Sequence, residues 1–359
     1  MYVYRTNLSS IEGSVNRRHD YGRQNKLTLE TRTHIKPQDA LSAALSAEME
    51  AVNALIQTRM ASKHAPRIPE VTAHLVNAGG KRLRPMLTLA AAKLCGYDGP
   101  YHIHLAATVE FIHTATLLHD DVVDESKKRR GRPTANLLWD NKSSVLVGDY
   151  LFARAFQLMV EPGNLQVLEI LSNAAATIAE GEVLQLTAAQ DLATSEDIYL
   201  QVVRGKTAAL FSAATEAGGV IAGAPEDHVK ALFDYGDALG VAFQMADDLL
   251  DYWGGDATGK NIGDDFRERK LTLPLIKAVA QAGANERAFW QRTIEKGKQT
   301  DGDLAEAVRL LNKHGALEET RQTALDWSNK ARDALSVLPS SDLRDMLESL
   351  SAYVVARIN

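Results

Sequence analysis

The sequence has a single cysteine, Cys95, among 359 residues. One cysteine excludes an intramolecular disulfide framework and a cage of thiolate ligands around a metal ion. No uninterrupted apolar segment reaches the roughly 20 residues that span a bilayer. The formal net charge of −6 disfavours a protein that binds nucleic acid through an overall basic surface. We therefore expect a cytoplasmic protein that does not cross a membrane and has no nucleic-acid partner.

Strand patterns are also scarce. No alternating run of Val, Ile and Thr bounded by hairpin turns occurs, and no strand–helix alternation calls for a parallel sheet. From Pro37 onward the apolar period is helical instead, because one buried stripe needs apolar residues three or four apart. The first stripe consists of Leu41, Leu45, Met49, Val52 and Leu55.

Similar stripes follow along the chain, separated by short breakers rich in glycine and proline. They lie at 86–95, 104–119, 145–160, 165–190, 197–222, 228–252 and 272–282, and near the C-terminus. Short connections make consecutive helices antiparallel neighbours, so the pattern predicts one all-α domain. The stretches 104–119 and 232–252 are apolar on most of their circumference, and we expect them to be central.

The N-terminal segment differs from the rest. Residues 1–36 show no helical periodicity and carry seven Lys/Arg against three Asp/Glu. We predict a poorly ordered extension there, as chain ends commonly are, followed by a catalytic domain at 37–359.

Two aspartate clusters stand out within the apolar stripes. Residues 120–124 and 247–251 both read Asp-Asp-x-x-Asp. In an α-helix the first and fifth positions lie on one face about one turn apart, so each cluster can converge on a cation. Like charges at this spacing destabilise a helix when no counter-charge is present. A solvated acidic helix end would explain one cluster, but two in apolar surroundings indicate a paired site for a metal ion and a diphosphate.

The ligand types indicate which metal ion to expect. Carboxylate oxygens with no cysteine nearby, and no histidine at a metal-binding spacing, favour a hard cation. Mg²⁺ keeps several water ligands and usually bridges one or two carboxylates to substrate phosphates. We therefore expect Mg²⁺ between the clusters and a diphosphate.

Basic and polar residues suited to a phosphate site accompany the clusters. The loop 79–85 concentrates three cations before a helix, where glycines permit close approach and free N–H groups add positive charge. A lone Lys is usually a surface residue and a lone His in a helix is usually a core residue, so these candidates gain weight only together. The candidates are Lys81, Arg84, His113, Arg129, Arg130, Lys206, Thr207, Gln244, Lys260 and Lys270.

Five motifs occur in order: GGKRLRP, LLHDDVVD followed by RRGRPT, GKTAALF, FQMADDLLD and GDDFRERKLTLPL. From about Ala40 to the C-terminus the chain resembles the trans-isoprenyl diphosphate synthases, specifically the long-chain polyprenyl members that make quinone side chains. The resemblance implies a helical bundle of the isoprenoid synthase type, usually homodimeric. A deep central cavity would lie between its helices, with the two aspartate motifs facing each other across the mouth.

The resemblance also implies a role for each motif residue. Asp120, Asp124 and Asp247 would hold Mg²⁺ against the allylic diphosphate, supported by Asp121, Asp248 and Asp251. Arg129, Lys206, Lys260 and Lys270 would contact that diphosphate, and Lys81, Arg84, His113 and Arg130 would bind isopentenyl diphosphate. Thr207 and Gln244 would turn their oxygens toward the developing allylic cation.

The implied reaction is head-to-tail condensation of an allylic diphosphate with successive isopentenyl diphosphates, giving an all-trans chain of about eight to ten isoprene units by analogy. Ala115 and Thr116, one turn before Asp120, would form the wall that the growing chain meets first, and both are small. So apolar a product would leave through transient membrane contact.

Three other functions are open to a chain with these residues. A shorter-chain farnesyl or geranylgeranyl synthase would share the motifs, and a non-catalytic helical partner subunit would share the fold. A terpene cyclase usually carries (N/D)DxxSxxxE as its second motif, but Asp251 and Gly255 occupy the Ser and Glu positions here. The second cluster therefore argues against cyclisation.

Overall fold

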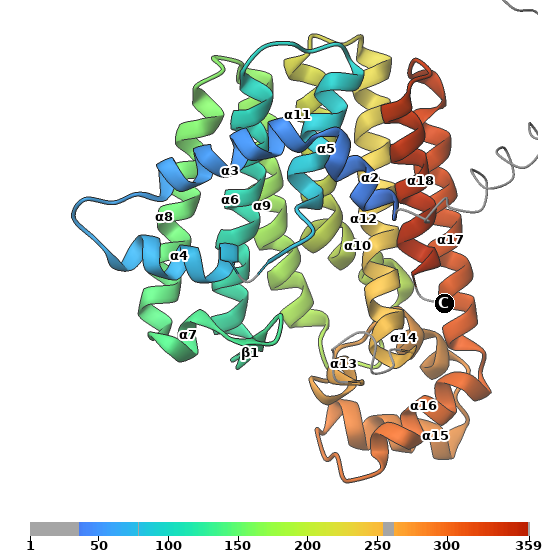
Figure 1. Cartoon of the computed structure of the whole chain (residues 1–359). Coiled ribbons are helices and arrows are strands. Elements are labelled where there is room, and N and C mark those ends of the chain that lie inside the picture. The colour runs from blue at the N-terminus through green and yellow to red at the C-terminus, as the bar shows by residue number, and fades with distance from the viewer. Residues whose placement is uncertain (1–35, 78, 254–261, 358–359) are drawn as a thin grey trace, which may run out of the picture. The chain divides into compact units, whose positions relative to one another are not determined.

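The computed structural model describes residues 36–357, apart from residue 78 and residues 254–261. Over these ranges the chain is built from helices and one two-stranded ribbon (Figure 1). The predicted all-α class is confirmed. The prediction of a poorly ordered extension at 1–36 falls on residues that, Lys36 excepted, lie outside the described ranges.

The elements follow one another in short succession. They are α2 (Pro37–Ala44), α3 (Ser46–Met60), α4 (Arg67–Asn77), α5 (Leu83–Leu94), α6 (Tyr101–Val123), β1 (Lys128–Arg129), β2 (Arg132–Pro133), α7 (Ala135–Leu138), α8 (Asn141–Val160), α9 (Leu165–Ala188), α10 (Glu196–Val203), the π-helix η1 (Arg204–Ala208), α11 (Ala209–Ile221), α12 (Glu226–Trp253), α13 (Asp264–Arg267), α14 (Leu273–Ala280), α15 (Ala284–Trp290), the π-helix η3 (Gln291–Glu295), α16 (Asp303–Lys313), α17 (Ala316–Ala334), the 3₁₀ helix η4 (Leu335–Val337) and α18 (Asp342–Ala356).

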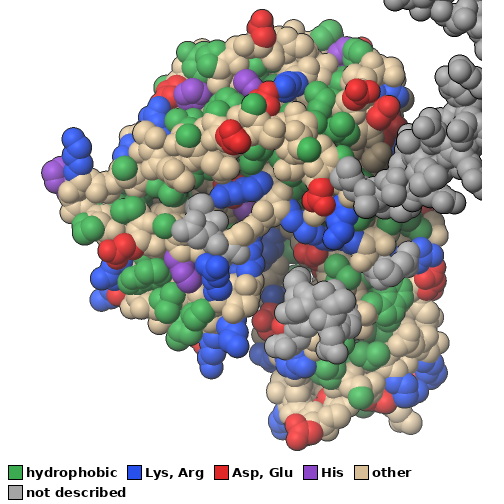
Figure 2. All heavy atoms as spheres, in the orientation of Figure 1, with side chains coloured by type: hydrophobic (Ala, Val, Ile, Leu, Met, Phe, Trp, Pro, Cys, Tyr) green, Lys and Arg blue, Asp and Glu red, His purple; other side chains and the backbone are tan. Residues whose placement is uncertain are grey.

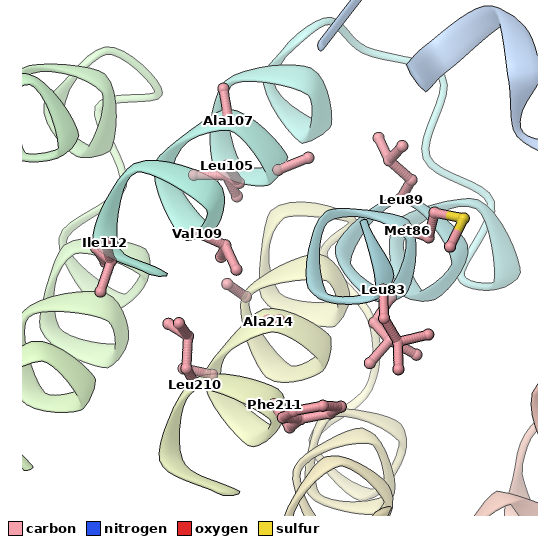
Figure 3. Packing of buried hydrophobic residues seen from close by; sticks show 14 of the residues in the cluster. Leu83, Met86, Leu89, Leu105, Ala107, Val109, Ile112, Leu210, Phe211 and Ala214 are labelled. Atoms are coloured by element: carbon pink, nitrogen blue, oxygen red, sulfur yellow. The ribbon is translucent and has the colours of Figure 1, made fainter. Parts of the chain in front are cut away.

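The main core lies where α5, α6 and α11 meet. Figure 3 shows Val109 of α6 beside Ala214 and Leu210 of α11, and Phe211 of α11 on the side of Leu83 of α5. α6 packs against α3, α5, α8 and α11, while α12 packs against α10, α11, α17 and α18. Both helices are thus surrounded by neighbours, as their all-round apolar sequences predict.

A second, smaller core supports the segment that follows α12. Phe266 of α13, Trp290 of α15 and Leu310 of α16 are buried there together with Leu249 and Tyr252 of α12. We call the segment α13–α16 the small lobe. Because its core reaches the end of α12, the small lobe fixes the position of the second aspartate cluster.

The first predicted stripe is divided between two helices. Leu45 has φ −112° and ψ 18°, outside the helical region, so α2 ends at Ala44 and α3 begins at Ser46. Leu41, Leu45, Met49 and Val52 are buried as predicted. Beyond the break Ile56 is buried while Leu55 is only half-buried, since the bend changes which face of α3 meets the core.

The predicted helix 197–222 contains a π-turn at η1 that the apolar pattern did not reveal. A π-turn holds one residue more than an α-turn and is often found at functional sites. Gly205 of this turn lies against Gly181 of α9, where a Cβ on Gly205 would stand 2.8 Å from the Gly181 Cα. The two backbones therefore touch, which brings the residues after Gly205 close to α9.

A two-residue hairpin follows α6, although the sequence predicted no strands. β1 pairs antiparallel with β2, and the two turn residues, Arg130 and Gly131, have φ of 52° and 75°. Two consecutive left-handed residues are typical of the tight hairpin turn whose twist matches that of the strands. The hairpin holds Arg129 and Arg130 beside the end of α6.

Among the described helices, none combines the length and apolarity that crossing a membrane requires.

Candidate active site

Charged side chains of both signs gather around a hollow in the visible face of the molecule (Figure 2). The two aspartate clusters end or interrupt the central helices, since the first lies at the C-terminal end of α6 and the second in the last turns of α12. Electrostatic interactions join them, because Asp124 acts on Lys270 and Asp247 acts on Arg84. The clusters therefore share one charged region with the basic residues around them.

In the first cluster the three aspartates have different surroundings. Asp121 is fully buried and accepts hydrogen bonds from Arg129, 2.9 Å from Nε and 2.8 Å from Nη2. Asp124 is exposed. Asp120 is half-buried, and this burial raises its pKa to about 6, with Lys206 acting in the opposite direction and Glu182 adding to the rise. A cation at Asp120 would remove this penalty on its charged form.

In the second cluster every aspartate has a protein partner. Asp247 forms an ion pair of 2.9 Å with Arg357, beyond the end of α18. Asp248 is buried and accepts from the Tyr199 hydroxyl at 2.6 Å and from the Gln244 amide at 2.9 Å.

Asp251 contacts the first turn of α13. Its two oxygens accept backbone N–H groups of α13, at 3.1 Å from Asp264 and 3.2 Å from Asp265. The carboxylate thus sits at the N-terminus of α13, where the helix dipole favours negative charge. These two hydrogen bonds join the end of α12 to the small lobe.

A cluster of arginines lies where α5 meets α6. The Arg84 guanidinium lies 4.5 Å above the Phe211 ring and donates to Nε2 of His113 at 3.3 Å. Burial lowers the pKa of Arg84 to about 10, and burial beside the arginines holds the pKa of His113 well below its usual range. The neutral imidazole can therefore accept from Arg84 through one nitrogen and donate to a ligand through the other.

Glu110 neutralises part of the positive charge of this arginine cluster. It forms an ion pair with Arg82, and the charges of Arg84 and Arg130 also act on it. The Arg130 guanidinium occupies the space that a side chain at Gly80 would need, since its Nη1 lies 2.8 Å from an ideal Cβ there. The glycine at position 80 therefore leaves free the space in which the Arg130 guanidinium lies.

Lys206 and Thr207 project from the π-turn η1. Lys206 forms an ion pair of 2.7 Å with Glu182 of α9, and the Thr207 hydroxyl donates to Oε1 of Gln244 at 2.8 Å. Both residues line a pocket of about 140 Å³. Its walls include Gln185, Tyr199, Lys206, Thr207, Gln244, Asp248, Asp265, Lys270 and Thr272.

The remaining predicted residues lie as follows. Lys260 lies outside the described residues, so its contact with the diphosphate stays a prediction. Lys81 is exposed in the loop before α5, and Lys270 pairs with Glu268. Ala115 is fully buried in the main core, while Thr116 is half-buried and donates to the His113 carbonyl at 2.9 Å. Neither lines the pocket above, and their role in chain length stays a prediction.

The carboxylates fit a hard cation, but not as a closed cage. Within 36–357 and outside its two gaps, no three His, Cys, Asp or Glu side chains are arranged to hold a metal ion by themselves. The half-buried Asp120 and the exposed Asp124 offer oxygen ligands to Mg²⁺, whose remaining positions would be filled by phosphate oxygens and water. The donor set therefore fits a cation that arrives with a diphosphate.

Comparisons with known proteins agree with this geometry. The profile of the family described as Polyprenyl synthetase matches residues 65–311. The chain belongs to this family. The octaprenyl diphosphate synthase of Escherichia coli (strain K12) is 46% identical over 311 residues, which cover 86% of this chain and 96% of that protein.

Solved structures of family members superpose closely on this polyprenyl synthetase. The crystal structure of a decaprenyl diphosphate synthase from Rhodobacter capsulatus has a TM-score of 0.87 and 72% identity, covering 90% of this chain and 99% of that chain. A polyprenyl synthase from Caulobacter crescentus CB15, in complex with calcium and isoprenyl diphosphate, has a TM-score of 0.86 and 52% identity, covering 90% and 98%. The predicted isoprenoid synthase fold is confirmed.

Four residues of this site were not predicted from the sequence: Glu110, Glu182, Tyr199 and Arg357. Glu110 left a signal, since it is a lone acid in the otherwise apolar stretch 104–119 and stands three residues before His113. The others left none, because each contacts the site through an element distant in the sequence. Their contributions could be found only once the helices were packed together.

Proposed function

We propose that this chain is a head-to-tail prenyltransferase that condenses an allylic diphosphate with successive isopentenyl diphosphates into a long-chain all-trans polyprenyl diphosphate of about eight to ten units. The observation that carries the proposal is the 72% identity with a decaprenyl diphosphate synthase over 90% of the chain. The paired aspartate clusters and the arginine cluster support it, because two diphosphates must be bound next to each other for this reaction.

The arginine cluster where α5 meets α6 binds isopentenyl diphosphate in this proposal. Arg84 is held in place by Phe211 and His113, so little side-chain freedom is lost when it contacts a phosphate. The charge of Arg130 acts on Arg84, and Lys81 is exposed in the loop that leads into α5, so both could add contacts to the same phosphates. Guanidinium groups suit this role because they bind phosphate oxygens in pairs.

The allylic diphosphate binds between the two clusters, near Lys206, Arg129 and Lys270. Asp120, Asp124 and Asp247 would hold Mg²⁺ against it, and the bound ions would neutralise the charge of the leaving diphosphate. Lys206 can then exchange its contact with Glu182 for one with the diphosphate. These cations favour departure of the diphosphate with the electron pair of the allylic C–O bond.

Carbon–carbon bond formation needs no side-chain nucleophile. The double bond of isopentenyl diphosphate, held next to the allylic cation, supplies the electron pair for the new bond. The product then loses a proton to the departed diphosphate and is five carbons longer. Thr207 and Gln244 line the pocket with oxygens that can face the positive charge.

Assembly and cellular role extend the proposal. The long helices α8 and α9 expose large apolar side chains, a pattern that marks interaction sites, and we infer a homodimer through them. The exposed apolar residues of the two helices include Leu146, Phe156, Val160, Leu165, Val183 and Leu186. The enzyme would be cytoplasmic, and its product would serve as a quinone side chain. Membrane contact during product release stays a prediction.

The function is tested by incubating the purified chain with farnesyl diphosphate, isopentenyl diphosphate and Mg²⁺. We expect diphosphate release, and mass spectrometry of the dephosphorylated products should show chains of about eight to ten units. Products of three or four units would favour the shorter-chain synthase, and cyclic hydrocarbon would favour a cyclase. Absence of diphosphate release would favour a non-catalytic subunit.

Chain length is tested separately with Ala115→Tyr. The added ring would block the path along α6, so we expect markedly shorter products at an unchanged rate of the first condensation. Thr108→Val, a buried change two turns earlier on α6, is the control. Unchanged product length in Ala115→Tyr would refute the wall assignment.

A further inference from the structure

Tyr199 is a buried residue of α10 that the reaction above does not use. Only 5% of its surface is exposed, and its hydroxyl donates to Oδ2 of Asp248 at 2.6 Å. Asp248 is itself 3% exposed. A short hydrogen bond to a buried carboxylate is among the stronger and more directional contacts available to a protein. Tyr199 therefore fixes the orientation of the Asp248 carboxylate.

Asp248 in turn fixes an amide. Gln244 donates from Nε2 to Oδ1 of Asp248 at 2.9 Å. A carboxylate is an acceptor only, so the NH₂ end of the amide must face it and Oε1 must face the other way. Oε1 points at Thr207, whose hydroxyl donates to it at 2.8 Å.

The chain of hydrogen bonds has one consequence for Thr207. A hydroxyl has one proton and two lone pairs. Because the proton is directed at Gln244, the lone pairs of Thr207 must point elsewhere, and Thr207 lines the pocket together with Lys206. An oxygen whose lone pairs face a positive charge stabilises it without reorganising during the reaction.

The π-turn η1 places the two ends of this hydrogen-bond series, Tyr199 and Thr207, on the same side of their helix. Tyr199 and Thr207 are eight positions apart, which would put them about 80° apart around a regular α-helix. The extra residue of η1 reduces this to the equivalent of seven positions, about two turns, so both side chains point toward α12. Both contact residues of α12 that are four apart, Gln244 and Asp248.

We propose that Tyr199 is a positioning residue: it holds Asp248, which holds the Gln244 amide, so that the Thr207 hydroxyl presents its lone pairs to the positive charge developing at the allylic carbon. This inference rests on the proposed prenyltransferase function. It assigns to Asp248 a role in orienting Gln244 rather than in direct contact with a metal ion.

The first test is Tyr199→Phe, which removes one hydroxyl and keeps the ring. We expect kcat to fall by roughly tenfold, less than the 10²–10³ typical for removal of a group that itself touches the transition state. KM for isopentenyl diphosphate should not change, because Arg84 and His113 belong to other helices. Tyr252→Phe is the matched control, since Tyr252 is equally buried on α12 and lies outside this hydrogen-bond chain.

The second test asks whether Tyr199 acts through Thr207. Thr207→Val keeps the shape and removes the hydroxyl, so the Tyr199→Phe change should cost nothing further in that background. Additive losses would overturn the proposal, because they would mean an independent structural effect. If Tyr199→Phe does not fold, Gln244→Met interrupts the same series of hydrogen bonds at its middle. It is then compared with Thr207→Val in the same way, alone and in the double variant.

The wild-type chain in the same assay separates the two proposals. An active wild type with Tyr199→Phe equal to Tyr252→Phe would overturn the positioning role alone. An inactive wild type would overturn the proposed function and the positioning role together. An active wild type, a slow Tyr199→Phe and a double variant no slower than Thr207→Val would support both.

Discussion

The two aspartate clusters have the same five-residue pattern, yet the structure surrounds them differently. The first ends α6 and continues into a loop, so Asp124 is exposed and only Asp121 is buried. The second lies inside α12, where α10, α13 and Arg357, just beyond α18, all contribute partners to it. The first cluster can adjust to a ligand, whereas the second is held in place before any ligand binds.

The middle aspartates are alike in one respect. Asp121 is paired with Arg129, and Asp248 with Tyr199 and Gln244, so each middle carboxylate is used inside the protein. The fifth positions differ most, since Asp124 faces solvent while Asp251 bonds the backbone of α13. A repeated motif therefore does not imply repeated roles at each of its positions.

The largest effect is expected at Asp120, a half-buried carboxylate whose charged form is disfavoured by burial. Asp120→Asn should lower kcat by about 10³-fold, because a ligand for the cation and its charge are lost. The melting temperature should stay the same or rise, since burial and the nearby Glu182 and Asp124 disfavour the charged carboxylate. Steady-state kinetics and calorimetry check this, with exposed Asp301→Asn as the control. A clear fall in melting temperature would contradict it.

The two arginine–aspartate pairs should differ in their contribution to stability. Arg129→Ala leaves the fully buried Asp121 charge without its partner, and we expect a loss of about 3 kcal/mol in unfolding free energy. Arg357→Ala should cost about 1 kcal/mol or less, because the Asp247 side chain is 33% exposed and water can solvate it. Denaturant unfolding measures both. Adding Asp121→Asn to Arg129→Ala should recover part of the loss, and equal effects of the two arginines would refute the distinction.

Substitutions at the fifth position of each cluster should separate an effect on stability from an effect on activity. Asp251→Ala leaves two backbone N–H groups of α13 without their acceptor, which costs about 1–3 kcal/mol. Asp124→Ala should not change stability but should lower activity, because its exposed carboxylate serves the ligand. Hydrogen exchange of the Asp264 and Asp265 amides should accelerate only in Asp251→Ala. Protection of these amides in that variant would contradict the proposed link between α12 and the small lobe.

The smallest effect concerns pH and the small lobe, which supports the second cluster alone. Contacts with Lys313 and His314 lower the pKa of Glu286 from 4.5 to about 2. Because the folded pKa is below the unfolded one, Glu286 contributes stability above about pH 4.5, and this contribution is lost as the pH falls toward 2. Hydrogen exchange at pH 5 and pH 3 should therefore show more loosening in α15 and α16 than in α6. Glu286→Gln should weaken this pH dependence, and an unchanged one would exclude Glu286 as its source.

Much of the fold could be predicted because helical periodicity depends only on nearby residues. The stripes at 104–119 and 232–252 correspond to α6 and α12, and the candidates Arg129, His113, Thr207 and Gln244 lie beside the clusters. What could not be predicted depends on packing between distant segments. The break at Leu45, the hairpin after α6 and the partners Tyr199 and Arg357 all follow from contacts that no local pattern encodes.

The π-turn at Arg204–Ala208 makes this site sensitive to chain length in a way that composition does not show. The same number of residues wound as a regular α-helix would still leave every apolar side chain available for the core. The helix after it would nevertheless be rotated by about 100° relative to α10, since each residue of an α-helix advances by that angle. Anyone who recombines related synthases at this segment should therefore count residues and keep the π-turn, because a fragment of equal length that winds as a regular α-helix would give a folded protein whose reaction centre is out of phase.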